Sequence, residues 1–317
     1  MSIRPGFTLA LLLFASLAHA GNMLFADHPL TGKIWDMNSR SFIDEAALLA
    51  KTNKADVLLL GETHDNTLHH EFQLKLLKAR IKSDTHSALM PALMMEQLNA
   101  EDQQALDWTL SGTNRNETLD RATRLIRFAD IQAYQPFLAM AIDNKLPVIA
   151  ANISNLRSQP VVRGGFSVYD ADELKRLAIE EVWNDSRQRF LMENMGGAHC
   201  GKLRDDLREG LTRGQRLRDA LMADVAVPSI ARGVVGIVGS SHARRDIGLP
   251  LYFVARAPNA RILSVGFIEV SPGVTDPNAY KAGSATGEAP YDVIWFTPRA
   301  ERADPCAKLP DIKETQP

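Results

Sequence analysis

Six short apolar runs recur along this 317-residue chain, and most of them contain no polar interruption. The runs are Val57–Leu60, Ala92–Met95, Val148–Ala151, Val234–Val238, Ile262–Val270 and Val293–Phe296. Continuous apolar runs of this length are typical of strands that are buried on both faces. The segments between them have helical periodicity, as Phe72, Leu76 and Leu77 show for the first segment. This alternation predicts an α/β protein with a mainly parallel sheet flanked by helices.

The interval between the third and fourth predicted strands is too long for a simple crossover. From Asn155 to Ile230 the sequence is charged, helical in character and without a convincing strand. A structureless stretch of this length would be unusual in a compact domain. We therefore predict one α/β domain over residues 21–298, with a helical insertion over about residues 155–230. Residues 299–317 are predicted to form a polar C-terminal tail.

The first twenty residues differ in character from the rest of the chain. They carry one charged side chain, Arg4, and an apolar run from Phe7 to Leu17 that precedes Ala18-His19-Ala20. A membrane-spanning helix needs roughly twenty apolar residues, which this run does not reach. The pattern predicts a secretory signal peptide over residues 1–20, cleaved near Ala20, with an uncleaved anchor as the alternative. No Cys follows the run to form a lipobox, so we expect a periplasmic mature chain without a transmembrane segment.

Cys200 and Cys306 are the only two cysteines, so export would allow a single intramolecular pair. A disulfide between them would tie the C-terminal tail to the middle of the chain. Two free thiols or a Cys metal ligand are the alternatives. The net charge of −2 and the lack of a basic patch argue against a nucleic-acid partner.

Polar side chains that can bind ligands follow four of the predicted strands. They belong to Gly61-Glu62-Thr63-His64, Glu96, Asn152 and Gly239-Ser240-Ser241-His242, in chain order. The crevice beyond the carboxyl ends of parallel strands is where open α/β sheets bind ligands. We therefore expect His64, Glu96 and His242 to meet in one functional site at this edge.

Two imidazoles and a carboxylate suit two kinds of chemistry. They can hold a divalent metal with an open position for water, or they can transfer protons near neutral pH. His64, Glu96 and His242 are therefore candidate metal ligands and candidate catalytic residues of a metal-dependent hydrolase. In the simpler interpretation each Gly-x-x-His is a helix-capping turn, and Glu96 caps the next helix. Glu62 would then have a structural role.

A second set of side chains suits haem iron. Met195 and His199 lie close together in a Gly-rich segment, and both residue types serve as axial haem ligands, as does tyrosine. By chemistry alone the tyrosine candidates are Tyr134, Tyr169 and Tyr252. Farther along the chain, one predicted helix face carries Gln215, Arg218, Asp219 and Met222. This face either approaches the sheet edge or is an ordinary salt-bridged surface.

Together these motifs resemble those of the ChaN-like haem-binding uptake family of the Tiki superfamily. The matching pieces are Gly61-Glu62-Thr63-His64-Asp65-Asn66 with His70, Glu96, Pro147–Asn152, Gln215-x-x-Arg218-Asp219-x-x-Met222-Ala223, Gly239-x-x-His242 through Pro250, His199-Cys200 and Asp304-Pro305-Cys306. The resemblance covers about residues 30–310. It implies an α/β core with a helical insertion, haem binding in iron acquisition, and a tyrosine iron ligand that no local motif assigns. Related Tiki, TraB and erythromycin esterase proteins use the corresponding His and Glu positions for metal-dependent or hydrolytic chemistry.

We therefore expect an exported haem-binding protein of haem or iron uptake. The haem would lie at the carboxyl edge of the sheet near the insertion, with Arg218, Arg244 or Arg245 paired to its propionates. The predicted haem-contacting residues are His199, Met195, His64, His242, Arg218 and Arg244. Haem is the expected partner, other haem-uptake components are further candidates, and a homodimer is compatible with the sequence. The alternative is a metal-dependent hydrolase built on His64, Glu96 and His242.

Overall fold

The computed structural model describes residues 23–83, 89–198, 200–281, 284–304 and 306–307. The predicted signal peptide and the predicted haem ligand His199 lie outside these residues. In the described part of the chain, no helix has both the length and the apolar character that crossing a membrane requires.

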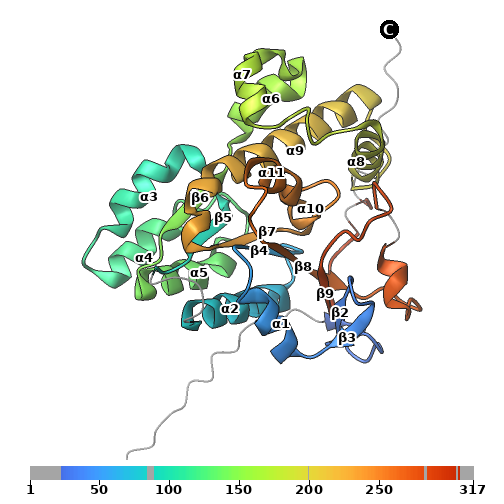
Figure 1. The fold of residues 1–317 in the computed structure, drawn as a ribbon, viewed down its shortest axis with the longest axis horizontal. Coiled ribbons are helices and arrows are strands. Elements are labelled where there is room, and N and C mark those ends of the chain that lie inside the picture. The colour runs from blue at the N-terminus through green and yellow to red at the C-terminus, as the bar shows by residue number, and fades with distance from the viewer. Residues whose placement is uncertain (1–22, 84–88, 199, 282–283, 305, 308–317) are drawn as a thin grey trace, which may run out of the picture.

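Eight strands form the main sheet in the order β3-β2-β9-β8-β4-β7-β5-β6 (Figure 1). The six predicted strands are all present and parallel, as β4 (Val57–Glu62), β5 (Ala92–Asn99), β6 (Val148–Asn152), β7 (Val234–Gly239), β8 (Ile262–Glu269) and β9 (Val293–Thr297). The antiparallel strands β2 (Ile34–Asp36) and β3 (Ser41–Ile43) extend one edge. A separate ribbon pairs β1 (Met23–Leu24) with β10 (Arg299–Ala300). The predicted α/β class is therefore confirmed.

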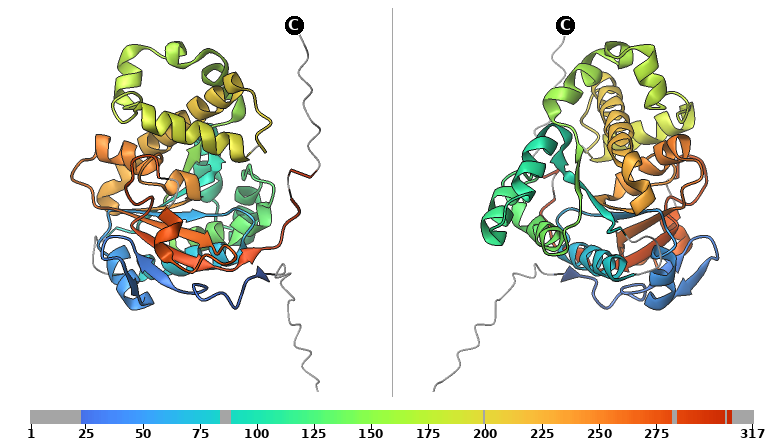
Figure 2. Two further views of the ribbon diagram at one scale, coloured as in Figure 1. Left: turned by 90° about the vertical axis from the view of Figure 1, so that its right-hand side faces the viewer. Right: turned by 60° about the vertical axis from the view of Figure 1, so that its left-hand side comes forward.

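Helices cover both faces of this sheet (Figure 2). Alternate residues of β4 point to opposite faces, because side chains in a strand alternate. Leu58 and Leu60 pack on the face covered by α1 (Glu45–Thr52), α2 (Thr67–Lys82), α3 (Gln103–Leu110), α4 (Arg115–Thr123) and α5 (Ile131–Asn144). Val57 and Leu59 pack on the face covered by α9 (Asp205–Ala226) and α11 (Leu249–Arg256).

The long interval between β6 and β7 is helical, as predicted. It contains α6 (Asn155–Gly164), η2 (Phe166–Val168), α7 (Ala171–Arg176), α8 (Asp185–Ala198), α9 and η3 (Val227–Arg232). The Ser154 side chain begins α6 by accepting a hydrogen bond from the Arg157 backbone N–H. Helix α6 crosses α9 closely at Gly210, where an added Cβ would lie 2.5 Å from the Val162 carbonyl oxygen. The insertion therefore packs onto the α/β core through α9.

The strand order places a crevice at the ends of β4, β5 and β7. Strand β7 lies between β4 and β5. Strand β4 is followed by α2, and β5 is followed by η1 (Ala100–Asp102) and α3; both α2 and α3 pack on the same face of the sheet. Strand β7 is instead followed by α10 (Ser240–Ala243) and α11, whose side chains belong to the other face. Such a reversal opens a ligand site beyond the carboxyl ends of the strands.

The C-terminal segment crosses back to the insertion. A disulfide joins Cys200, between α8 and α9, to Cys306, with the two Cα atoms 5.7 Å apart. Arg302 holds the same segment to the sheet edge through ion pairs with Asp65 and Glu269, each at 2.7 Å. The predicted cysteine pair is thus confirmed. The η4 turn (Pro277–Lys281) lies in the loop that precedes β9.

Candidate functional site

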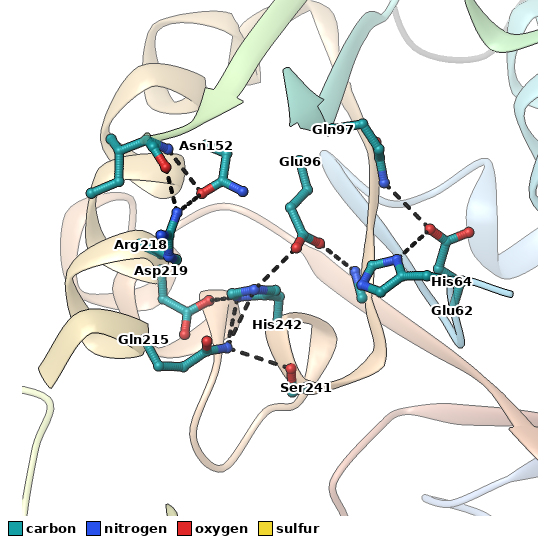
Figure 3. Close-up of polar contacts among 12 residues, drawn as sticks. Glu62, His64, Glu96, Gln97, Asn152, Gln215, Arg218, Asp219, Ser241 and His242 are labelled. Carbon is teal, nitrogen blue, oxygen red and sulfur yellow. Dashed lines mark hydrogen bonds and ion pairs between the residues drawn. The ribbon is translucent and has the colours of Figure 1, made fainter. Parts of the chain in front are cut away.

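The structure brings His64, Glu96 and His242 together at the carboxyl edge of the sheet (Figure 3). Glu96 Oε1 lies 3.3 Å from His242 Nε2, and Glu96 Oε2 accepts a hydrogen bond from the Gly239 N–H at 2.5 Å. A Cβ on Gly239 would lie 2.9 Å from His64 Nε2 and 3.4 Å from Glu96 Oε2. A glycine is required there because any side chain would displace these two groups.

His242 is held between two carboxylates. Its Nδ1 lies 2.7 Å from Asp219 Oδ1, while its Nε2 faces Glu96, and all three side chains are buried. Burial opposes the charge on His242, but Glu96 and Asp219 outweigh it and raise the pKa of His242 to about 10. Burial likewise opposes ionisation of Glu96, but His242 overcomes it and lowers the pKa of Glu96 to about 2. His242 is therefore held as a cation between the two carboxylates.

Asp219, the second carboxylate that contacts His242, lies on helix α9. Burial raises the pKa of Asp219 to about 6 against the opposing effect of His242. Gln215, one turn earlier, places its Nε2 3.1 Å from His242 Nδ1 and 3.4 Å from Ser241 Oγ. The predicted polar face of this helix thus approaches the sheet edge. The sequence did not predict that Asp219 contacts His242. The only signal was that Asp219 lies four positions after Gln215, on the same predicted helix face.

His64 has a different environment, because its side chain is 43% exposed. Its Nδ1 lies 2.9 Å from Glu62 Oε1, which also accepts a hydrogen bond from the Tyr134 hydroxyl at 2.6 Å. Glu62 Oε2 lies 3.0 Å from His70 Nε2. Burial of Glu62 is outweighed by these two histidines, which lower its pKa, and the pKa of His64 is raised in turn. Glu62, which the sequence left as structural, is therefore the central acceptor beneath His64.

The two ring nitrogens of His64 differ in their hydrogen-bond partners. A carboxylate at Nδ1 favours the tautomer in which Nδ1 carries the proton and Nε2 carries a lone pair. Nε2 has no hydrogen-bond partner among the described residues. His64 is accordingly the histidine of this edge that can ligate a metal ion or haem iron.

A hollow of about 420 Å³ opens beside these residues. It is lined by Glu96, Asn99, Arg127, Phe128, Asn152, Ile153, Ser154, Asn155, Gln215, Arg218 and His242. The His64 ring contacts Phe128, one of these lining residues, with the two ring centroids 4.9 Å apart. This volume is within the range of small-molecule sites, which run from about 300 to 1,000 Å³.

Other predicted haem contacts lie away from this hollow. Met195 is on α8 and is not among the lining residues. Arg244 pairs with Asp246 at 2.7 Å and packs over the Phe190 ring, and Arg245 pairs with Asp292 at 3.0 Å. The structure thus brings Arg218, and not Arg244, to the hollow.

The three candidate tyrosines are placed differently. Tyr134 is buried with its hydroxyl on Glu62, and burial raises its pKa strongly. Tyr252 is buried among the side chains of α9 and α11. Tyr169 is half-buried and packs against the small cluster that contains Ile153 and Leu217. Of the three, Tyr169 is the least buried, although it is not among the residues that line the hollow.

Among the residues that the structure describes, no group of three or more His, Cys, Asp or Glu side chains is arranged to hold a metal ion. A divalent metal at His64, Glu96 and His242 stays a prediction.

Fold and site together define an α/β protein whose candidate ligand site lies at a sheet edge beside a helical insertion. The family model for haem-binding uptake proteins of the ChaN type, in the Tiki superfamily, matches residues 48–253. The chain therefore belongs to this haem-binding uptake family, which confirms the resemblance seen in the sequence.

Two solved structures illustrate the likeness. One, described as cofacial haem binding to ChaN of Campylobacter jejuni, superposes with a TM-score of 0.66 at 20% identity, covering 83% of this chain and 95% of that one. The other, an erythromycin esterase mutant in its open conformation, gives a TM-score of 0.47 at 12% identity, covering 86% and 99%. A search of the curated proteins found no match.

Proposed function

We propose that this chain is an exported haem-binding protein of haem or iron uptake, which holds haem at the carboxyl edge of the sheet. Membership of a haem-binding uptake family supports haem as the ligand. The observation that carries the location is the half-exposed His64, whose Nδ1 is fixed on buried Glu62 and whose Nε2 is left for iron. When bound, haem would supply the iron centre.

One aromatic contact beside His64 supports this location. Phe128 offers an aromatic wall beside the imidazole, and the hollow continues from it toward the insertion. Of the eleven residues that line the hollow, Phe128 and Ile153 are apolar and the other nine are polar or charged, so the hollow itself supplies few of the apolar contacts that a porphyrin needs. His242 would support the site as a fixed charge and not as an iron ligand.

Export is supported by two independent features. The first twenty residues have the pattern of a secretory signal peptide, and the two cysteines form a disulfide. Structural disulfides persist in oxidising compartments such as the bacterial periplasm. We therefore place the protein in the periplasm.

A hemin titration of the purified full-length chain tests this function. The wild-type protein should give a saturable shift of the Soret band. We expect His64→Ala to lower hemin affinity by at least about tenfold, because the iron loses its protein ligand. His28→Ala, which removes a histidine that does not line the hollow, is the matched control and should bind like wild type. Absence of a saturable shift would overturn haem binding, and a normal His64→Ala titration would overturn this location.

A metal-dependent hydrolase is the second candidate. It is favoured by Glu96, whose carboxylate lies beside both His64 Nε2 and His242 in one gap. Metal retained after gentle purification, together with ester or peptide hydrolysis that His64→Ala abolishes, would support it. Metal-free protein that stays inactive with added Mn²⁺, Co²⁺ or Zn²⁺ would exclude it.

A further inference from the structure

The hollow at the sheet edge has a lining that suits a ligand other than a porphyrin. Most of its lining residues are polar, and its volume is about 420 Å³. Covering polar groups costs free energy unless the ligand supplies matching hydrogen bonds. The polar groups of the lining that have no partner within the protein therefore indicate what the hollow can bind.

Asn152 provides a hydrogen-bond donor with a fixed orientation. It lies at the end of β6 and is only 8% exposed. Its Oδ1 accepts hydrogen bonds from Arg218 Nη1 at 2.6 Å and from the Ile153 N–H at 2.8 Å. Turning the amide over would set its NH2 group against these two donors, so the NH2 group lies on the other side (Figure 3). No described residue accepts a hydrogen bond from this Nδ2.

Asn155, in the first turn of α6, repeats this arrangement. Its Oδ1 accepts a hydrogen bond from Arg218 Nη2 at 2.7 Å, and in the described part of the chain nothing accepts from its Nδ2. Arg218 also donates to the Ile153 carbonyl and to Ser158 Oγ, so four of its five N–H hydrogens are used within the protein. Arg218 therefore orients the two amides, which leaves both of their NH2 groups available to a ligand.

Glu96 provides an acceptor in the same hollow. It is buried and lies on β5, the strand next to β6. Its Oε2 accepts a hydrogen bond from the Gly239 N–H, and its Oε1 lies 3.3 Å from His242 Nε2. Each oxygen of a carboxylate has two lone pairs, so Glu96 can also accept a hydrogen bond from a ligand. The hollow thus offers both fixed donors and an acceptor.

The charges around the hollow favour a neutral ligand. An anion would meet the Glu96 carboxylate. The cations that could attract an anion are already engaged, because Arg127 pairs with Asp102 at 3.0 Å and His242 lies between two carboxylates. A cation would be repelled by Arg218, whose four acceptors are all neutral. A hydroxyl group satisfies these conditions, because it is neutral and both donates and accepts a hydrogen bond.

We infer that this hollow binds a small neutral sugar through the NH2 groups of Asn152 and Asn155 and the carboxylate of Glu96. A sugar hydroxyl can accept a hydrogen bond from an amide and donate one to a carboxylate at the same time. The C–H face of the sugar ring would contact Phe128 and Ile153, the two apolar residues of the lining. This binding function is additional to haem binding and does not depend on it.

Ligand-observed NMR titration of the full-length chain tests this inference, with the methyl glycosides of glucose, galactose and mannose as probes. At least one glycoside should bind saturably. The amino sugar and the uronic acid of the same configuration, which carry opposite charges, should bind at least about tenfold more weakly. The inference is wrong if none of the three glycosides gives a saturable signal, or if the neutral amide N-acetylglycinamide binds more tightly than all of them. A hemin titration of the wild type tests the proposed function independently, so the two can fail separately.

Asn152→Asp is the decisive variant, because it replaces the NH2 donor by an oxygen and keeps the acceptor for Arg218. It should weaken glycoside binding by at least about tenfold, while a thermal melt reports whether the fold is retained. Asn116→Asp is the matched control, since Asn116 is exposed on α4 and does not line the hollow, and it should bind like wild type. Unchanged binding by a folded Asn152→Asp would overturn the inference. If that variant unfolds, Asn155→Asp at the exposed position decides in its place: weaker binding supports the inference, and unchanged binding overturns it.

Discussion

His242 and His64 show how two histidines of similar sequence context acquire opposite properties. Both follow a strand in a Gly-x-x-His turn, yet His242 is buried between two carboxylates and His64 is half exposed over one. The first is a fixed cation, and the second retains a ring nitrogen for a ligand. The difference arises from Asp219, which α9 delivers to His242 alone.

The fixed charge of His242 predicts an alkaline loss of stability. Its pKa is raised to about 10, so its ion pairs stabilise the fold fully below about pH 6.5, the ordinary histidine pKa. This contribution is lost as the pH rises toward 10. The free energy of unfolding, measured by urea denaturation between pH 7 and 10, should fall more steeply for wild type than for His242→Gln.

The neighbouring groups do not mimic this effect. Glu96, with a pKa lowered to about 2, loses its contribution only as the pH falls below about 4.5. Asp219, with a pKa raised to about 6, is fully ionised before the alkaline range begins. Equal slopes for wild type and His242→Gln between pH 7 and 10 would contradict the assignment.

For single residues, the sequence indicated His64, Glu96 and His242 because each follows an apolar run. It could not indicate their partners. Tyr134 and Glu62 are 72 positions apart, and Asp219 and His242 are 23 apart. No local pattern links such residues, since only the packing of α5 and α9 on the sheet brings them into contact.

Among the elements, the contact between α6 and α9 determines how the insertion sits on the core. Gly210 lets the two helices approach so closely that an added Cβ would lie 2.5 Å from a backbone oxygen of α6. Nearby Gly214 faces the Val162 side chain at 2.9 Å in the same way. This contact holds Asn155 and Ser158 against the Arg218 guanidinium at the edge of the hollow.

We predict that Gly210→Ala destabilises the protein even though Ala favours helices. The helix gains about 1 kcal/mol in intrinsic propensity, but the overpacked crossing costs about 1–3 kcal/mol. The matched control is Gly197→Ala in α8, where an added Cβ meets open space. Urea denaturation should show a lower midpoint for the first variant and an unchanged or higher one for the second. The reverse order would show that the crossing is not tight.

The elements themselves were largely predictable. The six buried strands are long enough to produce continuous apolar runs, which is why each was found. The strands β1, β2, β3 and β10 contain two or three residues each, so no periodicity can reveal them. They form because tertiary partners such as β9 are already in place.

In the whole molecule, one covalent link spans the insertion and the tail. The disulfide closes a loop over 106 positions, and Arg302 fixes the same segment beside the turn that carries His64. The C-terminal segment therefore links the insertion to the turn that carries His64.

We predict that the Cys200→Ser, Cys306→Ser double variant loses about 4–5 kcal/mol of unfolding free energy in the chain-entropy model. Chemical denaturation with and without reductant measures this loss. Reductant should destabilise wild type by a similar amount and leave the double variant unchanged. A loss below about 1 kcal/mol would show that the reduced chain stays compact, because the model assumes an unrestricted unfolded loop.

The amino-acid sequence by itself determined the α/β class, the six buried strands, the helical insertion, the cysteine pair and the residues delivered to the sheet edge. These follow from periodicity and residue type, which act locally along the chain. The tertiary structure alone decided the strand order, the contact of Asp219 with His242 and the contact of His64 with Glu62. It also decided that Arg218 contacts neutral acceptors. These depend on contacts between distant segments, because burial and charge acquire their energies only when the packed fold excludes water.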